Sequence, residues 1–281
     1  MGLLRHIEAV NRWDPARFRP LVLGERRVGR IRHDFAPLLA AFPAVFAVET
    51  DRVRLRPDPA EPEALTAAVA LATRRLVADG AIPNWRGEWF DVVAGDDEQA
   101  LFRVDRGALP RLGMRAAGVH LNGYVRRPDG IHLWIARRSP DKKLDPDKLD
   151  NMVAGGIGAG HGPWSTLLKE GEEEAALPAD LLARAHPAGI ATYVMEREDG
   201  LRDDLLYLYD LEMPEDVVPR PNDGEIADFR LLPATDVLAL VRDTDRIKFN
   251  VNVTLIDFFV RHGILRPGDP DYVAICRGLR R

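Results

Sequence analysis

A glycine-rich loop runs directly into an acidic helical segment between Gly155 and Leu177, with the sequence GGIGAGHGPWSTLLKEGEEEAAL. An α-helix returns to the same face after three and four residues, so Glu170, Glu173 and Glu174 share one face. Three carboxylates on one patch repel each other, and more strongly if the face is enclosed. A hard divalent cation removes this conflict, because Mg²⁺ is commonly bound by carboxylates, waters and substrate phosphates. The segment therefore predicts a site for a metal ion and a phosphate chain.

A solvated acidic face is the usual explanation for a run of glutamates, and it is the alternative to a metal site here. The glycines do not support another kind of phosphate loop. Their spacing fits neither the G-x-G-x-x-G turn of dinucleotide-binding proteins nor the G-x-x-x-x-G-K-[ST] loop of nucleoside triphosphatases. Both of those loops are therefore excluded.

The spacing resembles the Nudix box: Gly, five residues, Glu, seven residues, then Arg-Glu-hydrophobic-any-Glu-Glu-any-Gly-hydrophobic. The three metal-binding acids of that pattern fall on Glu170, Glu173 and Glu174. The chain departs from the pattern at His161 for Glu, Lys169 for Arg, Gly171 for a hydrophobic residue and Ala176 for Gly. None of these departures removes a metal-binding acid. The replaced Glu and Arg brace each other in the family, so His161 and Lys169 together predict that this brace is remodelled or lost.

Composition limits the class of protein. The 281 residues, 46% hydrophobic and 30% charged, allow one or two domains, and we expect two. A net charge of −5 argues against a nucleic-acid partner. Cys276 is the only cysteine, so no intrachain disulfide can form. Charges at Arg5, Glu8 and Arg12 interrupt any signal peptide, and no long apolar span follows, so we expect a cytoplasmic protein without membrane segments.

Hydrophobic patterns divide the chain into residues 1–112 and 113–281. The first part predicts helices at 33–42 and 63–78, strands at 21–23, 28–31 and 89–93, and a first helix with Leu3, Ile7 and Val10 on one stripe. The second predicts strands at 120–127, 131–138 and 149–154, a hairpin of 188–196 with 205–212, a strand at 225–231 and a final helix at 249–261. Strands around an acidic helix indicate an α/β/α sandwich, preceded by a smaller α+β domain; the fold class is α+β.

The resemblance extends beyond the box to one Nudix group, the group related to thiamine pyrophosphokinase, whose members carry an extra N-terminal domain. The similar segments are AFPAVFAV at 41–48, NWRGEWFDV at 84–92, GVHLNGYV at 118–125, LWIARRS at 133–139, KLDNMVAGG at 148–156, DGEIADFRL at 223–231 and IDFFVRHG at 256–263. The resemblance implies a hydrolase of a diphosphate linkage that uses Mg²⁺, with Mn²⁺ as a substitute.

The resemblance also assigns site residues. Glu170, Glu173 and Glu174 would hold metal together with the backbone carbonyl of Ala154. Glu173, Glu174 and Glu225 are the catalytic candidates, with Glu225 either a metal ligand or the general base. The candidate substrate-binding residues are Arg137, Arg138, Lys142, Lys148, Gly155 and Gly156, with Lys143 and Lys248 as further basic candidates. A solvated basic loop is the alternative for each of the cations.

Several choices stay open at this stage. Trp85, Trp89, Phe90 and Trp134 either stack on a substrate ring or belong to the core. The substrate implied by the resemblance is thiamine diphosphate or its oxo and oxy forms, converted to monophosphates. Nucleoside diphosphate derivatives, and a binding module without catalysis, are the alternatives. The N-terminal domain would cap the site, recognise the base or form a homodimer.

Overall fold

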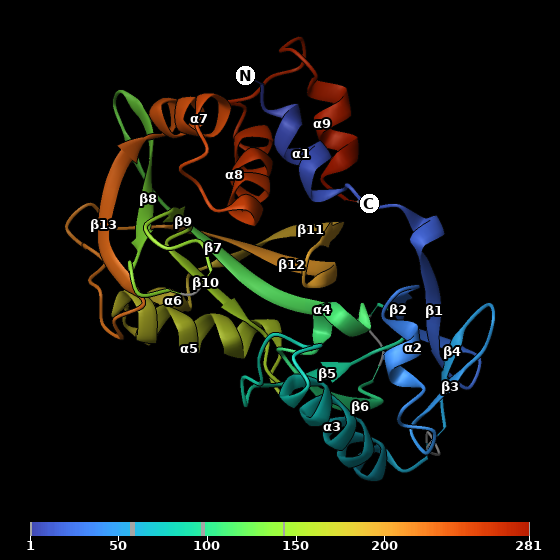
Figure 1. The fold of residues 1–281 in the computed structure, drawn as a ribbon. Coiled ribbons are helices and arrows are strands. Elements are labelled where there is room, and N and C mark those ends of the chain that lie inside the picture. The colour runs from blue at the N-terminus through green and yellow to red at the C-terminus, as the bar shows by residue number, and fades with distance from the viewer. Residues whose placement is uncertain (1, 57–59, 97–98, 143, 281) are drawn as a thin grey trace.

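The computed structural model describes residues 2–56, 60–96, 99–142 and 144–280. The chain forms a smaller N-terminal α+β domain followed by a larger part with helices on both faces of a sheet (Figure 1). This is the α+β fold class that the sequence predicts. Among the helices described, none combines the length and the apolar character that crossing a membrane requires.

The N-terminal domain is built on a four-stranded sheet in the order β2-β1-β4-β3, with a separate β5-β6 pair beside it. Its elements are η1 Pro15–Arg17, β1 Phe18–Leu23, β2 Arg26–Arg32, α2 Ala36–Leu39, β3 Phe46–Val48, β4 Val53–Leu55, α3 Pro62–Ala78, β5 Trp89–Val92, β6 Phe102–Asp105 and α4 Leu109–Leu112. Helix α3 buries Leu65, Val69 and Leu76 in the core of this domain, at the helical spacing that predicted it.

The larger part is centred on the long strand β7, which pairs with β12 in parallel and with β8 and β10 antiparallel. Its elements are β7 Arg115–Arg127, β8 Gly130–Arg138, β9 Leu149–Asp150, β10 Val153–Gly156, α5 Pro163–Ala175, α6 Ala179–Leu182, β11 His186–Arg197, β12 Gly200–Glu212, β13 Ile226–Pro233, α7 Ala234–Asp243, α8 Phe249–Arg261 and α9 Tyr272–Gly278. The main path of the sheet is β11-β12-β7-β8-β13. Helices α5 and α6 cover one face, and α7 and α8 cover the other (Figure 1).

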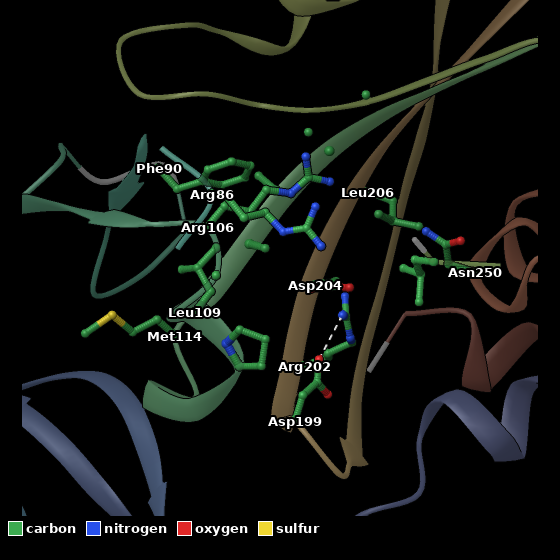
Figure 2. A pocket seen from close by; sticks show the side chains of 18 of the residues that line it. Arg86, Phe90, Arg106, Leu109, Met114, Asp199, Arg202, Asp204, Leu206 and Asn250 are labelled. Carbon is green, nitrogen blue, oxygen red and sulfur yellow. Dashed lines mark hydrogen bonds and ion pairs between the residues drawn. The ribbon is translucent and has the colours of Figure 1, made fainter. Parts of the chain in front are cut away.

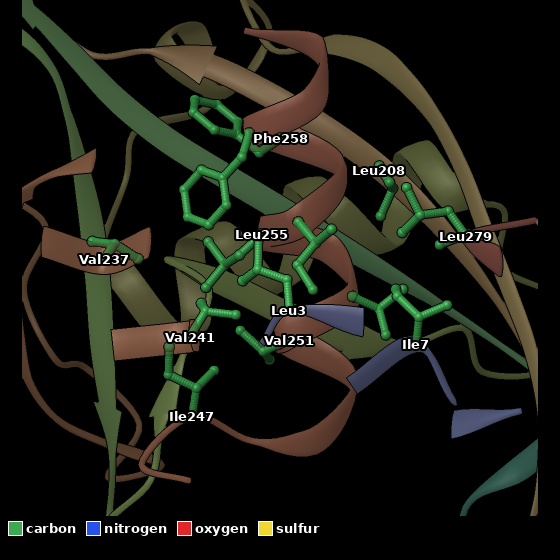
Figure 3. Close-up of a cluster of buried hydrophobic side chains, with 14 of the residues drawn as sticks. Leu3, Ile7, Leu208, Val237, Val241, Ile247, Val251, Leu255, Phe258 and Leu279 are labelled. Atoms are coloured by element: carbon green, nitrogen blue, oxygen red, sulfur yellow. The ribbon is translucent and has the colours of Figure 1, made fainter. Parts of the chain in front are cut away.

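The first helix, α1 Leu4–Val10, packs on this larger part. Its buried side chains Leu3, Ile7 and Val10 join the same hydrophobic cluster as α8 and α9 (Figure 3). The apolar stripe therefore predicted a helix, but the helix covers the second core rather than the sheet that follows it in sequence. Helices α1 and α9, which lie near opposite ends of the chain, pack side by side on this face of the molecule (Figure 1).

Two predicted elements differ from the structure. The helix expected at 33–42 is only α2, and it cannot start at 33 because Pro37 is tolerated only in the first turn of a helix. The strand expected at 149–154 is two strands, since β9 pairs with β8 whereas β10 pairs with β7. The helix expected at 249–261 is confirmed as α8, but it is not the final helix because α9 follows it. Helix α7, which starts directly after β13, was not predicted.

Two of the departures from the Nudix box have structural explanations in α5. A Cβ on Gly171 would lie 2.5 Å from Cδ2 of Leu182, so glycine lets α6 pack closely on α5. Ala176 ends the helix with a positive φ of 51°. That left-handed position is where glycine normally ends a helix, and a residue with a Cβ costs roughly 1 kcal/mol there.

These two positions give opposite predictions for the free energy of unfolding in urea. Ala176→Gly should stabilise the protein by about 0.5–1 kcal/mol by removing the strain at positive φ. Gly171→Ala should destabilise it by about 1–3 kcal/mol through overlap with Leu182, although Ala is the better helix former. A stabilising Gly171→Ala would contradict the packing described for α5 and α6.

Candidate active site

The acidic face of α5 lies against the backbone of β10. The carboxylate of Glu174 accepts a hydrogen bond of 2.9 Å from the Ala154 N–H, and Glu174 is only 5% exposed. A Cβ on Gly155 would overlap the side chain of Glu170, so glycine at this position allows Glu170 to lie directly on the strand. The loop-and-helix segment singled out in the sequence therefore brings Glu170 and Glu174 onto one short stretch of β10.

Lys169 lies beside two of the three acids. Its Nζ is 3.2 Å from Glu170 Oε1 and 2.5 Å from Glu173 Oε2. In the part of the chain that the structure describes, no hydrogen bond joins Lys169 to His161, and no three acidic, histidine or cysteine side chains are close enough together to hold a metal ion. The ammonium of Lys169 supplies positive charge at the acidic face in this arrangement.

Glu174 carries the clearest electrostatic perturbation at this face. Burial raises the pKa of Glu174 to about 8, and the neighbouring Asp150 and Glu170 carboxylates also raise it. The hydrogen bond from Ala154 and the charge of Lys248 act in the opposite direction. A buried carboxyl among other carboxylates is stabilised in its ionised form by hydrogen bonds from donors and by additional positive charge.

Glu225 reaches the same region from the segment that precedes β13. It forms an ion pair with Lys142. Burial and the nearby Arg138 lower the pKa of Lys142, whereas the charge of Glu174 raises it, which places Lys142 near both glutamates. Lys142 and Glu225 therefore lie close to the acidic face.

A buried polar cluster supports the face from behind. Asp150, 3% exposed, accepts from Arg138 Nη1 at 2.8 Å and from Lys248 Nζ at 3.2 Å. The next residue, Asn151, hydrogen-bonds the ring of His120 through its side chain at 2.8 Å. Burial lowers the pKa of His120 to about 4, helped by the charge of Lys248, so His120 is neutral near pH 7.

A cavity of about 300 Å³ opens beside β10, between the N-terminal domain and the sheet. Its lining includes Arg86, Phe90, Arg106, His120, Ala154, Gly155, Gly156, Asp199, Arg202, Asp204, Leu206, Lys248 and Asn250. Figure 2 shows Arg86 and Arg106 extending into it from the N-terminal domain, with Arg202, Asp204 and Asn250 on the other side. The cavity and the acidic face share Ala154, so the two form adjoining parts of one site.

The structure separates the predicted basic residues. Arg137 is held by Asp228 at 2.6 Å and Asp147 at 2.9 Å, and Arg138 is buried on Asp150. Lys148 pairs with Asp145 at 3.5 Å. Of the predicted substrate-binding and basic residues, those that lie at the cavity or the acidic face are Lys142, Lys248, Gly155 and Gly156. Lys143 falls outside the described residues.

The aromatic candidates divide in the same way. Phe90 lines the cavity, and Trp134 is 7% exposed in the core beneath α5. Trp85 and Trp89 pack edge to face on each other, with centroids 5.7 Å apart. Sequence reasoning missed five residues that line the cavity: Arg86, Arg106, Arg202, Asp204 and Asn250. The only signal that could have pointed to any of them was the NWRGEWFDV segment, which contains Arg86.

Helices on both faces of a mixed sheet, with an acidic helix lying on a glycine strand, define a Nudix fold. The family model for the NUDIX domain matches residues 117–251, and the model for a domain of unknown function, DUF4743, matches residues 2–116. The chain is 37% identical over 283 residues to Nudix hydrolase 24, chloroplastic, of Arabidopsis thaliana, a match that covers 99% of this chain and 78% of that protein. The chain belongs to the Nudix hydrolase family, which hydrolyses diphosphate linkages.

Two further relatives match over both domains. Nudix hydrolase 20, chloroplastic, of Arabidopsis thaliana is 35% identical over 290 residues, covering 99% of this chain and 78% of its own length. The uncharacterized protein YJR142W of Saccharomyces cerevisiae is 31% identical over 215 residues, covering 71% of this chain and 62% of its own length. The pairing of an N-terminal domain with a Nudix domain is therefore shared with these relatives.

The raised pKa of Glu174 gives a pH-dependent prediction for the protein in EDTA. Because the folded pKa of about 8 lies above the ordinary value of 4.5, the contribution of Glu174 to stability is complete below pH 4.5 and is lost as the pH rises through 8. The upper bound is about 5 kcal/mol, from about 1.4 kcal/mol per pKa unit. Urea unfolding of the wild type against Glu174→Gln should show this loss in the wild type alone; identical pH profiles would contradict it.

Proposed function

We propose that this protein is a Mg²⁺-dependent hydrolase that converts a diphosphate ester to its monophosphate by attack of water at phosphorus. The observation that carries the proposal is Glu174, a carboxyl buried among other carboxylates on a face that adjoins a cavity lined by cations. The bond between the two phosphates breaks, the water oxygen joins the terminal phosphorus, and inorganic phosphate leaves.

The acidic face suits a divalent cation in its chemistry. Its donors are hard carboxylate oxygens, and a bound cation would offset both the burial and the neighbouring carboxylates that raise the pKa of Glu174. We propose Glu170, Glu173, Glu174 and the carbonyl of Ala154 as ligands, with Mn²⁺ able to replace Mg²⁺. When bound, the metal would neutralise phosphate charge and acidify a water molecule.

The protein's own residues would orient the reaction. Lys169, freed from Glu170 and Glu173 on metal binding, and Lys142 would hold negative phosphate oxygens. Glu225 is the candidate for a further ligand or for the base that takes the proton of the water, with Glu173 and Glu174 as the other catalytic carboxylates. Arg138 and Lys248 would act through Asp150 by fixing β9 and the start of α8.

For the substrate we propose thiamine diphosphate, and above all its oxo and oxy forms. The support is the resemblance of seven segments over both domains to the thiamine pyrophosphokinase-related group, together with a cavity large enough for a small heterocycle. Phe90 would contact the ring. Nucleoside diphosphate derivatives remain the second candidate, favoured by the same acidic face.

We further propose a cytoplasmic location, supported by a lone cysteine, and a small molecule rather than nucleic acid as partner, supported by the net charge of −5. We also propose a domain boundary between 112 and 113, supported by the end of α4 at Leu112 and the positive φ of 56° at Gly113. A homodimer is a further proposal, resting on the frequency of symmetric dimers alone.

The test is phosphate or monophosphate release with Mg²⁺ and with EDTA from thiamine diphosphate, its oxo and oxy analogues, dNTPs, 8-oxo-dGTP, ADP-ribose and NADH. We expect metal-dependent turnover with the highest kcat/KM on the oxo or oxy forms. Preference for a nucleotide would refute the thiamine assignment, and absence of turnover on all would refute hydrolysis of these diphosphates.

Glu174→Gln should lower kcat by at least about 100-fold in that assay while the protein stays folded, because the substitution removes a charge and keeps the shape. The matched control is Glu172→Gln on the exposed face of the same helix, which should leave kcat within about twofold. Equal losses in both variants would mean that the buried acid has no special role.

A further inference from the structure

Two arginines of the N-terminal domain extend into the cavity of the Nudix domain. Arg86 lies in the loop before β5, and Arg106 follows β6 directly. Figure 2 shows their guanidinium groups next to each other at the cavity, in front of β7. They belong to the N-terminal domain, which contains none of the acids of the Nudix box, so they bring to the cavity positive charge that the box does not supply.

Asp105 fixes the backbone at both arginines. Its side chain is 1% exposed and accepts from the backbone N–H groups of Arg86 at 3.0 Å, Gly87 at 2.7 Å and Gly107 at 2.9 Å. The Arg106 N–H also donates to the Glu88 carbonyl at 2.8 Å. One buried carboxylate therefore ties together the two segments from which the arginines arise, and their positions are set in advance of any ligand.

The charges of the two arginines are incompletely compensated. Arg106 pairs with one half-exposed acid, Glu88, at 2.7 Å. Arg86 has no side-chain hydrogen bond or ion pair with any residue in the described ranges. Two adjacent guanidinium groups repel each other, and a shared anion removes that repulsion while using their planar donors. The pair is therefore suited to a phosphate.

The two arginine side chains and the acidic face of α5 adjoin at the glycines of β10. A Cβ on Gly156 would lie 3.7 Å from Cζ of Arg106 and 2.8 Å from Phe90, so both side chains approach this strand closely. The side chain of Glu170 packs directly on the preceding residue, Gly155. The glycine pair of β10 thus lies between the arginines on the cavity side and the metal-binding acids on the helix side.

We propose that Arg86 and Arg106 bind the phosphate that remains on the organic product, so that the N-terminal domain completes the substrate site. This rests on the proposed function. The terminal phosphate would lie beside the divalent cation that Glu170 and Glu174 would hold, the retained phosphate at Gly155 and Gly156 under the arginines, and the organic group in the cavity beyond. The same phosphate contacts exist before and during the reaction, so they set KM rather than kcat.

The test uses the double variant Arg86→Ala with Arg106→Ala, the single variant Arg86→Ala, and the control Arg75→Ala. Arg75 is an exposed arginine on α3 paired with Asp79, so it matches the change of charge away from the cavity. Two quantities are measured: the Kd of inorganic pyrophosphate in EDTA by calorimetry, and KM and kcat with Mg²⁺ on the best substrate.

For the double variant we expect Kd and KM to rise at least tenfold with kcat within about twofold, and a smaller rise for the single variant, which loses no internal contact. Arg75→Ala should match the wild type. Unchanged Kd and KM, or no pyrophosphate binding by the wild type, would overturn the inference.

Calorimetry keeps the two proposals separate. Metal-dependent hydrolysis with unchanged Kd and KM in the double variant would refute the arginine site and leave the proposed function standing. Loss of pyrophosphate binding in the double variant, in a protein that hydrolyses none of the panel, would support the arginine site and refute the proposed function.

Discussion

The buried carboxylate of Asp150 is the interaction on which the Nudix domain and its site depend. Burial alone would raise its pKa, but Lys248 and Arg138 bring the pKa below the ordinary value, so the group is ionised. Its two ion pairs join β8, β9 and the residue that starts α8. Removing one partner of such a buried pair typically costs about 3–5 kcal/mol, because the remaining charge stays buried. The same charge raises the pKa of Glu174 and holds Lys248 at the cavity.

A chain of polar side chains extends from this carboxylate through the core. Asn151 accepts from Thr254 at 2.7 Å and donates to Asn122 at 2.7 Å, and Asn122 donates to Asp210 at 3.0 Å. Hydrogen bonds from His262 and Arg261 outweigh burial and lower the pKa of Asp210 to about 2. Strands β7, β9 and β12 and helix α8 are thus joined by polar bonds as well as apolar packing, which gives β10 and its glycines a fixed support.

Features that depend on residues close together in the sequence could be predicted, whereas features that depend on contacts between distant segments could not. Helical periodicity placed Glu170 and Glu174 on one face, and the structure brings both onto β10. Sequence spacing could not show that Arg137 forms ion pairs with two aspartates, nor that α1 packs on the core of the larger part of the chain. Arg86 and Arg106 were missed for the same reason: only tertiary contacts bring a loop of the N-terminal domain to a Nudix strand.

The acidic face of α5 and the cavity between the domains adjoin at Gly155 and Gly156 and form one site. A crystal structure of the protein with Mg²⁺ and inorganic pyrophosphate tests it most directly. We expect metal at Glu170 and Glu174, and a diphosphate that passes over the two glycines to reach Arg106. Pyrophosphate and metal bound away from β10, or a diphosphate confined to the helix side of the strand, would contradict it.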